Sequence, residues 1–179
     1  MKNLLSLPNF FTILRFILTI EFLILFLKNK FLLASIILAI SSITDFLDGF
    51  LARILKQKTA IGSFLDAFVD KMLIITTIIA LASKNLIPLW FFTIIIARET
   101  LVSAGWIITY QRKLSFSVKP RFLGKVSIVL ETITMTIVIL NVHLKEKIIF
   151  DMLNEMFFIT ALFVIGSFID YIIFARRVS

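Results

Sequence analysis

The chain has 179 residues, of which 60% are hydrophobic and 17% charged, and its formal net charge is +8. This composition lies outside the range of soluble globular proteins and indicates an integral membrane protein. Cysteine is absent, which excludes disulfides, thiolate metal ligands and a cysteine nucleophile. The basic residues lie in short loops between apolar runs, so we expect anionic lipid headgroups or phosphorylated substrates as partners, and no nucleic acid.

Six apolar segments are each long enough for a helix to cross a bilayer, which takes about 20 residues. In chain order they are Phe10–Leu27, Phe31–Leu55, Ile61–Ser83, Pro88–Tyr110, Phe122–Asn141 and Asn154–Phe174. Pro8 and Asn9 precede the first segment and Pro88 opens the fourth, as is typical of helix starts. No small-residue cleavage site follows the first segment, so we expect a retained helix and not a signal peptide. The connections are short, which predicts one all-α membrane domain over residues 1–179 with six transmembrane helices.

The uneven distribution of Lys and Arg between the two sets of connections predicts the orientation. With both termini in the cytoplasm, the inner side holds most of these residues, namely Lys2, Arg53, Lys56, Lys58, Arg112, Lys113, Lys119, Arg121, Lys125, Arg176 and Arg177. The outer side then holds Lys28, Lys30, Lys84, Lys145 and Lys147. The chain starts without a transit peptide, so we expect a bacterial inner (cytoplasmic) membrane.

Four aspartates lie within the second and third segments at helical spacing. Asp45 and Asp48 are three residues apart, and Asp66 and Asp70 are four apart, so each pair occupies one helical face. The two faces can meet across a helical hairpin and open into a polar cavity that faces the cytoplasm. A carboxylate at membrane depth is costly and points to function. Oxygen ligands suit hard cations, so we expect Mg²⁺ or Mn²⁺, as two ions a few ångströms apart.

Three basic residues lie within the apolar segments: Arg15, Lys71 and Arg98. In lipid each of them needs an acidic partner or an aqueous cavity. Lys71 follows Asp70 and points about 100° away from it on a helix, so we expect Lys71 to pair charge or snorkel and not to be the catalyst. Arg98 with Glu99 is interpreted either as an intramembrane ion pair or as a substrate contact.

The stretch from Asp45 to Asp70 resembles, at every fixed position, the signature D-x2-D-G-x2-A-R-x8-G-x3-D-x3-D of the CDP-alcohol phosphatidyltransferase family. Members of that family are compact integral membrane enzymes. The resemblance implies that the aspartates hold divalent metal against the diphosphate of a CDP-linked lipid, and that the metal ligands are Asp45, Asp48, Asp66 and Asp70. Asp70 matches the family's proposed base, and relatives form homodimers, which we also expect here.

The same resemblance implies a binding site for the CDP-lipid. Gly49 and Ala52 would flank the cytidine, where a larger side chain would block the nucleotide, and Arg53 would pair with phosphate. Gly62 belongs to the same set, because Gly49, Ala52 and Gly62 lie on or beside the aspartate faces and permit close helix approach or access by a ligand.

The acceptor alcohol is indicated by residues outside this signature. Pro8 to Arg15 looks like the P-N-x2-T-x2-R start of phosphatidylglycerophosphate synthases and cardiolipin synthases in the family. Arg98-Glu99 is similar to the R-E segment of the former group, which implies transfer of phosphatidyl from CDP-diacylglycerol to glycerol 3-phosphate with release of CMP. Arg98, Arg121 and Lys125 are the candidate acceptor-binding residues, because cations suit a phosphorylated alcohol.

Two alternatives stay open at this point. Ser127 stands in a segment that departs from the usual G-K-x-K-T, and Glu131 stands where Gln is common, so a cardiolipin synthase-type enzyme or another CDP-alcohol phosphotransferase is the alternative within the family. From a different class, a cation transporter would use intramembrane acids as ion sites. It would explain the aspartates but not Gly49, Ala52 and Arg53.

Overall fold

The structure is a computed structural model that describes residues 7–55, 60–111 and 122–178. Within these ranges the side chains of some residues lie outside the description, namely those of 7–9, 45–55, 60–64, 66, 67, 106–111 and 174–178.

Each of the apolar segments forms one α-helix. The helices are α1 (Leu7–Leu27), α2 (Phe31–Leu55), α3 (Ala60–Ser83), α4 (Leu89–Gln111), α5 (Phe122–Leu144) and α6 (Lys147–Val178). The prediction of an all-helical protein is confirmed for the described part of the chain. Pro8 and Asn9 lie in the first turn of α1 instead of before it, and Pro88 directly precedes α4. Both prolines therefore sit where a missing backbone N–H is tolerated.

The helix α6 begins seven residues before the predicted start at Asn154. The reason is a tight turn after α5, in which Lys145 adopts a φ of 56°. The backbone N–H of Glu146 donates to the side-chain oxygen of Asn141 over 3.1 Å, and its carbonyl accepts from the N–H of Phe150 over 3.1 Å. These bonds satisfy backbone groups at the junction, so the chain enters α6 at once.

The helices α1 and α3 end in the same way. Asn29 and Asn85 follow them with φ values of 58° and 55°, in the left-handed region that asparagine tolerates at helix ends. The N–H of Lys30 donates to the carbonyl of Leu25 over 2.9 Å, and the equivalent bond after α3 runs over 3.0 Å. Lys84 Nζ joins the two turns, since it lies 2.5 Å from Asn29 Oδ1.

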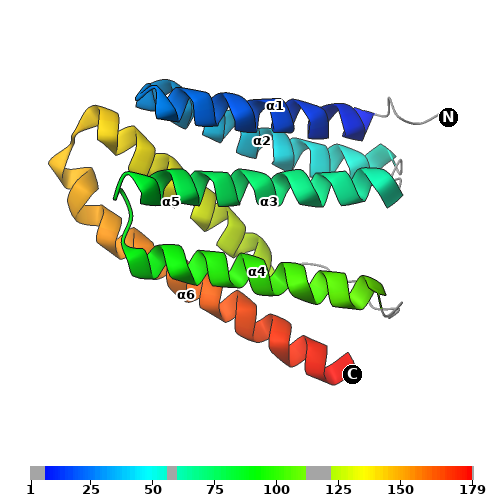
Figure 1. Cartoon of the computed structure of the whole chain (residues 1–179). Coiled ribbons are helices and arrows are strands. Elements are labelled where there is room, and N and C mark those ends of the chain that lie inside the picture. Colours follow the sequence, from blue (N-terminus) through cyan, green and yellow to red (C-terminus); the bar gives the residue numbers. More distant parts are fainter. Residues whose placement is uncertain (1–6, 56–59, 112–121, 179) are drawn as a thin grey trace.

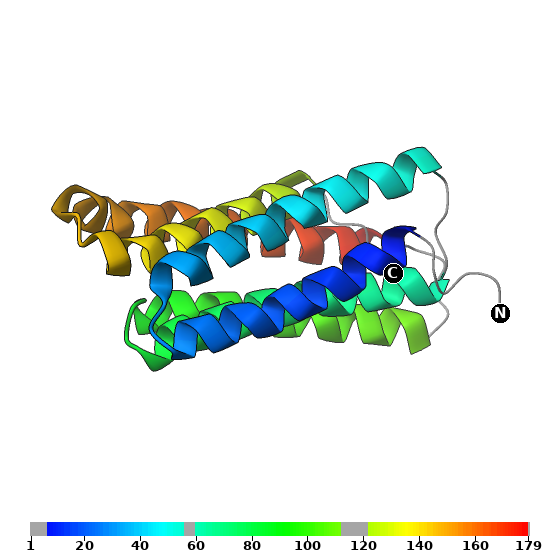
Figure 2. The same cartoon turned by 90° about the horizontal axis from the view of Figure 1, so that it is seen from above.

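The six helices of the described residues form two layers of three (Figures 1 and 2). One layer contains α1, α3 and α4, and the other contains α2, α5 and α6. Contacts between α1 and α2, between α3 and α5, and between α4 and α6 hold the layers together. Because α2 and α3 both pack against α1 and against α5, the two helices that carry the aspartates border the same part of the interior.

The apolar core lies in the half of the bundle near the α1–α2, α3–α4 and α5–α6 turns. It includes Phe26 of α1, Leu81 of α3, Phe91 of α4 and Ile139 of α5, all of them fully buried. Such packing fixes the ends of three helical hairpins against one another. The other half of the interior is therefore where polar residues can gather.

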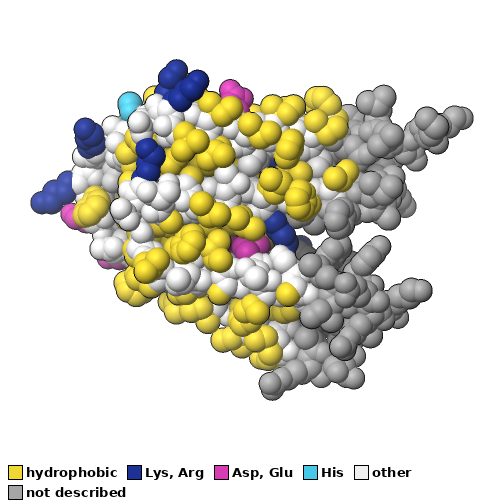
Figure 3. Space-filling model, viewed as in Figure 1, with side chains coloured by type: hydrophobic (Ala, Val, Ile, Leu, Met, Phe, Trp, Pro, Cys, Tyr) yellow, Lys and Arg dark blue, Asp and Glu magenta, His cyan; other side chains and the backbone are white. Residues whose placement is uncertain are grey.

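Polar side chains inside and apolar side chains outside mark the described surface as one that faces lipid. Arg15 and Glu131 are fully buried, whereas Phe158 and Leu162 are 62% and 69% exposed. Figure 3 shows apolar side chains spread over one face, and most of the described Lys and Arg on that face lie at the end that carries the α1–α2 and α5–α6 turns. Three helices contain described stretches apolar enough to cross a membrane, Phe10–Leu27, Phe122–Leu144 and Lys147–Ile173, and Phe31–Thr44 is a shorter one. The protein is therefore a membrane protein.

Candidate functional site

The four aspartates lie on two continuous helices, as predicted. Asp45 and Asp48 belong to α2, and Asp66 and Asp70 to α3, so each pair occupies neighbouring turns of one helix. Of the four carboxylates the description includes that of Asp70. The side chains of the other predicted site residues on these helices lie outside the described residues, namely Asp45, Asp48, Asp66, Gly49, Ala52, Arg53 and Gly62, as does the whole of Arg121.

Asp70 forms an ion pair with Arg15 of α1. The Arg15 side chain is fully buried, whereas that of Asp70 is 36% exposed, so the carboxylate is open on one side while the guanidinium is enclosed. Thr19 donates a hydrogen bond to the backbone carbonyl of Arg15 over 2.8 Å. Of the acidic partner and the aqueous cavity that the sequence allowed for Arg15, the structure shows the acidic partner. A carboxylate held in this way can accept a proton or ligate a cation from its exposed side.

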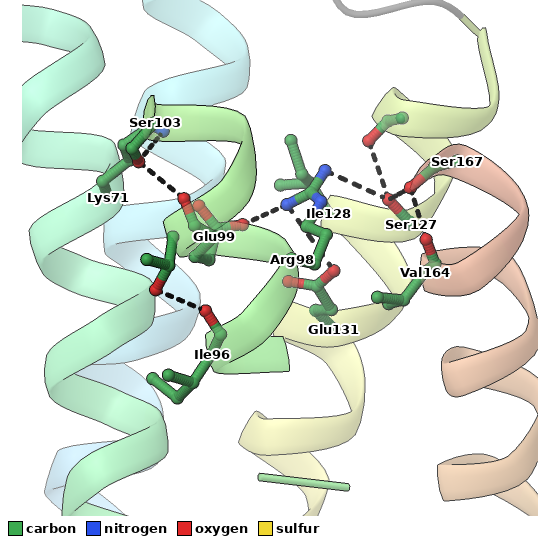
Figure 4. Close-up of polar contacts among 12 residues, drawn as sticks. Lys71, Ile96, Arg98, Glu99, Ser103, Ser127, Ile128, Glu131, Val164 and Ser167 are labelled. Atoms are coloured by element: carbon green, nitrogen blue, oxygen red, sulfur yellow. Dashed lines mark hydrogen bonds and ion pairs between the residues drawn. The ribbon is translucent and has the colours of Figure 1, made fainter. Parts of the chain in front are cut away.

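Arg98 of α4 lies at the centre of a buried polar cluster (Figure 4). Its guanidinium contacts Glu99, and its Nη1 lies 3.8 Å from a carboxylate oxygen of Glu131 on α5. Its Nη2 donates to Ser127 Oγ over 3.4 Å, and Ser127 lies 3.5 Å from Ser167 on α6. The guanidinium therefore joins α4 to α5, and Ser127 extends the cluster to α6. Of the two interpretations of Arg98 with Glu99, the intramembrane ion pair is observed, and the substrate contact stays a prediction.

Lys71 contacts a hydroxyl group, whereas the sequence predicted an acidic partner or an aqueous cavity. Its Nζ lies 2.5 Å from Ser103 Oγ of α4, and that hydroxyl donates to the backbone carbonyl of Glu99 over 2.6 Å. Among the described residues no carboxylate oxygen lies within 4.0 Å of the ammonium. Lys71 is half-buried and extends from α3 toward Ser103 of α4 (Figure 4). Asp70, by contrast, pairs with Arg15 of α1.

The remaining members of the site differ in their exposure. Lys125 is exposed at the start of α5, where a solute could reach it. Glu131 is fully buried, and neither of its carboxylate oxygens has a hydrogen-bond partner. Sequence reasoning had assigned no role to Glu131, Ser103 or Ser167. The sequence indicates these residues only as an acid or a hydroxyl inside an apolar span. Such a group requires a polar partner in lipid, but the sequence does not identify that partner.

Together, the contacts define what we call the polar layer: Arg15, Asp70, Lys71, Arg98, Glu99, Ser103, Ser127, Glu131 and Ser167. It draws on α1, α3, α4, α5 and α6 and lies on the far side of the apolar core from the three tight turns. Carboxylates, cations and hydroxyls within a membrane protein's interior are suited to binding charged groups and transferring protons.

Several known proteins are similar to this chain in sequence. A protein of Rickettsia felis named CDP-diacylglycerol--glycerol-3-phosphate 3-phosphatidyltransferase is 32% identical over 153 residues, which are 84% of this chain and 83% of that protein. A protein of the same name in Aquifex aeolicus is 27% identical over 170 residues, 93% of each chain. A Drosophila melanogaster protein named probable cardiolipin synthase (CMP-forming) is 33% identical over 111 residues, which are 61% of this chain and 34% of that protein.

The sequence model of one family, CDP-alcohol phosphatidyltransferase, matches residues 5–167. This range includes the four aspartates and every residue of the polar layer, on α1 to α6. The match thus covers the site as well as the fold, and the chain belongs to the CDP-alcohol phosphatidyltransferase family.

Proposed function

We propose that this protein transfers the phosphatidyl group of CDP-diacylglycerol to glycerol 3-phosphate, releasing CMP and forming phosphatidylglycerophosphate. The observation that carries this proposal is the similarity, over 84% and 93% of the chain, to two proteins named for that reaction. The buried charges within an apolar bundle support it, because the reaction joins a lipid to a charged, water-soluble alcohol.

The residues proposed to hold divalent metal are Asp45, Asp48, Asp66 and Asp70. Their carboxylate oxygens are the donors that Mg²⁺ and Mn²⁺ prefer, and the exposed side of Asp70 leaves room for a ligand. Two ions would fit a set of four carboxylates. When bound, the metal would neutralise the diphosphate and stabilise CMP as the leaving group.

Asp70 is the proposed base. Its carboxylate would accept the proton of the acceptor hydroxyl as that oxygen attacks the lipid-linked phosphorus, and the bond between this phosphorus and the CMP oxygen would break. Arg15 positions the carboxylate, since the ion pair holds Asp70 on the side of α3 that faces α1. Gly49, Ala52, Arg53 and Gly62 are the proposed contacts for the CDP-lipid.

We also propose that all six helices cross the membrane as one domain, with the polar layer opening toward the cytoplasm. The tight turns carry Lys28, Lys84 and Lys145, while more of the basic residues occur at the other end of the bundle, which is the cytoplasmic side by the distribution of charge. We further propose that the membrane is the bacterial inner membrane and that the protein forms a homodimer.

The acceptor is tested with purified protein in mixed micelles that contain CDP-diacylglycerol and Mg²⁺ or Mn²⁺. CMP release is followed with glycerol 3-phosphate, with phosphatidylglycerol and with no acceptor. We expect release with glycerol 3-phosphate, to which Arg98, Arg121 and Lys125 are the proposed acceptor contacts. A cardiolipin synthase-type reaction is the second candidate, because of the Drosophila relative. Release with phosphatidylglycerol alone would establish that alternative and contradict ours.

A further inference from the structure

Three cations lie within the described parts of the helices at the polar layer, and they differ in how their charge is balanced. Arg15 is fully buried and paired with Asp70, and Arg98 is 9% exposed and contacts two carboxylates. Lys71 is half-buried, and its partner among the described residues is the neutral hydroxyl of Ser103. Of these three cations, Lys71 alone combines partial exposure with a charge that no described carboxylate contacts.

The position of Lys71 places this charge beside the proposed chemistry. Lys71 follows Asp70 in the sequence, so the two Cα atoms are about 3.8 Å apart. Their side chains point to different neighbours, Asp70 to α1 and Lys71 to Ser103 of α4. A substrate that delivers its hydroxyl to Asp70 could therefore place a second group, a few bonds away, at the Lys71 ammonium.

We propose that Lys71 binds the phosphate of the acceptor alcohol. This inference rests on the proposed function, because glycerol 3-phosphate carries a phosphate a few bonds from its reacting hydroxyl. A phosphate oxygen accepts a charge-assisted hydrogen bond from an ammonium, which is stronger than the bond to a serine hydroxyl. Ser103 is then a positioning residue that holds the ammonium between α3 and α4 until the acceptor arrives. The CDP-lipid diphosphate has the proposed metal as its counter-charge and does not require Lys71.

The test measures CMP release by the full-length protein, with each substrate varied while the other saturates. Lys71→Met should raise the KM for glycerol 3-phosphate about tenfold to a hundredfold, the loss expected for one charged hydrogen bond, and leave the KM for CDP-diacylglycerol unchanged. Lys71→Arg should recover part of the loss. Lys84→Met is a matched control, because Lys84 is also half-buried with a neutral partner at 2.5 Å, in the turn between α3 and α4 at the other end of the bundle.

The wild-type measurement separates this proposal from the proposed function. Wild-type protein that releases no CMP with glycerol 3-phosphate would contradict the proposed function itself. An active wild type whose Lys71→Met variant keeps the wild-type KM for glycerol 3-phosphate, or shows a raised KM for CDP-diacylglycerol instead, would overturn the assignment of Lys71 alone. If Lys71→Met does not fold, Lys71→Gln offers a neutral side chain with a polar end for the same comparison.

Discussion

Removing the cation from the Arg98 cluster should destabilise the protein far more than removing the charge of Glu131. Arg98→Met leaves Glu99 and Glu131 buried without their guanidinium, at 3% and 0% exposure. Breaking a buried ion pair in this way costs about 3–5 kcal/mol. With about 2–4 °C per kcal/mol for a chain of this length, the unfolding temperature should fall by at least about 6 °C.

Glu131→Gln should change the unfolding temperature only slightly, and the contacts of Glu131 give the reason. The Glu131 oxygen lies 3.8 Å from Arg98 Nη1, beyond hydrogen-bond distance. Burying a carboxylate costs several kcal/mol, and neither oxygen of Glu131 has a hydrogen-bond partner to offset that cost. The amide keeps the shape and loses the charge, so the unfolding temperature should stay within about 4 °C of wild type.

Both variants are measured by heating the purified protein in detergent and following tryptophan fluorescence. We expect a large decrease for Arg98→Met and little change for Glu131→Gln. Equal decreases for the two variants would refute the reasoning, because they would mean that the Glu131 charge is as necessary as the guanidinium that it faces.

Three further predictions concern helix packing and helix ends. Gly105→Ala should lower the unfolding temperature, since the added methyl would lie 2.6 Å from Tyr171 Oη, and Tyr171→Phe in the same chain should restore most of it, because the nearest ring atoms lie at 3.4 Å. Failure of that rescue would show that another contact is responsible. Arg15→Met should lower the free energy of unfolding by about 1–3 kcal/mol, which is less than for Arg98→Met, because Asp70 is 36% exposed and water can replace the lost partner. A larger decrease in the unfolding temperature than for Arg98→Met would contradict this prediction. Asn85→Ala should lower the free energy of unfolding by about 1–2 kcal/mol, because the φ of 55° at this position is unfavourable for alanine. Asn85→Gly should be tolerated, because glycine adopts positive φ readily. The same thermal measurement compares the two variants.

The helices could be predicted from the sequence because apolar runs of membrane-spanning length have few other solutions. The start of α6 could not be predicted, because the charged residues Lys147 and Asp151 are typical of a loop. In the structure the helix begins directly after the turn at Lys145 and includes both of them. A pattern of charges predicts that a segment is polar. It does not predict whether Asn141 will satisfy the backbone of the next helix.

The polar layer was predictable only in part. Helical spacing predicts which residues share a face of one helix, and it placed each aspartate pair correctly along α2 and α3. Partners on different helices depend on how the helices pack and rotate, so the pairing of Arg15 with Asp70 had no signal beyond the need for an acid. No feature of the sequence indicated the hydroxyl partner of Lys71, because a serine within an apolar span is compatible with many roles.

The rate of CMP release by an Asp70→Asn variant tests the central claim most directly. Wild type and variant are purified in the same detergent, shown by thermal unfolding to be folded, and supplied with CDP-diacylglycerol, glycerol 3-phosphate and Mg²⁺ or Mn²⁺. A carboxylate that serves as general base contributes about a hundredfold or more, so the variant should lose at least that factor in kcat. A folded variant that releases CMP at nearly the wild-type rate would contradict the account.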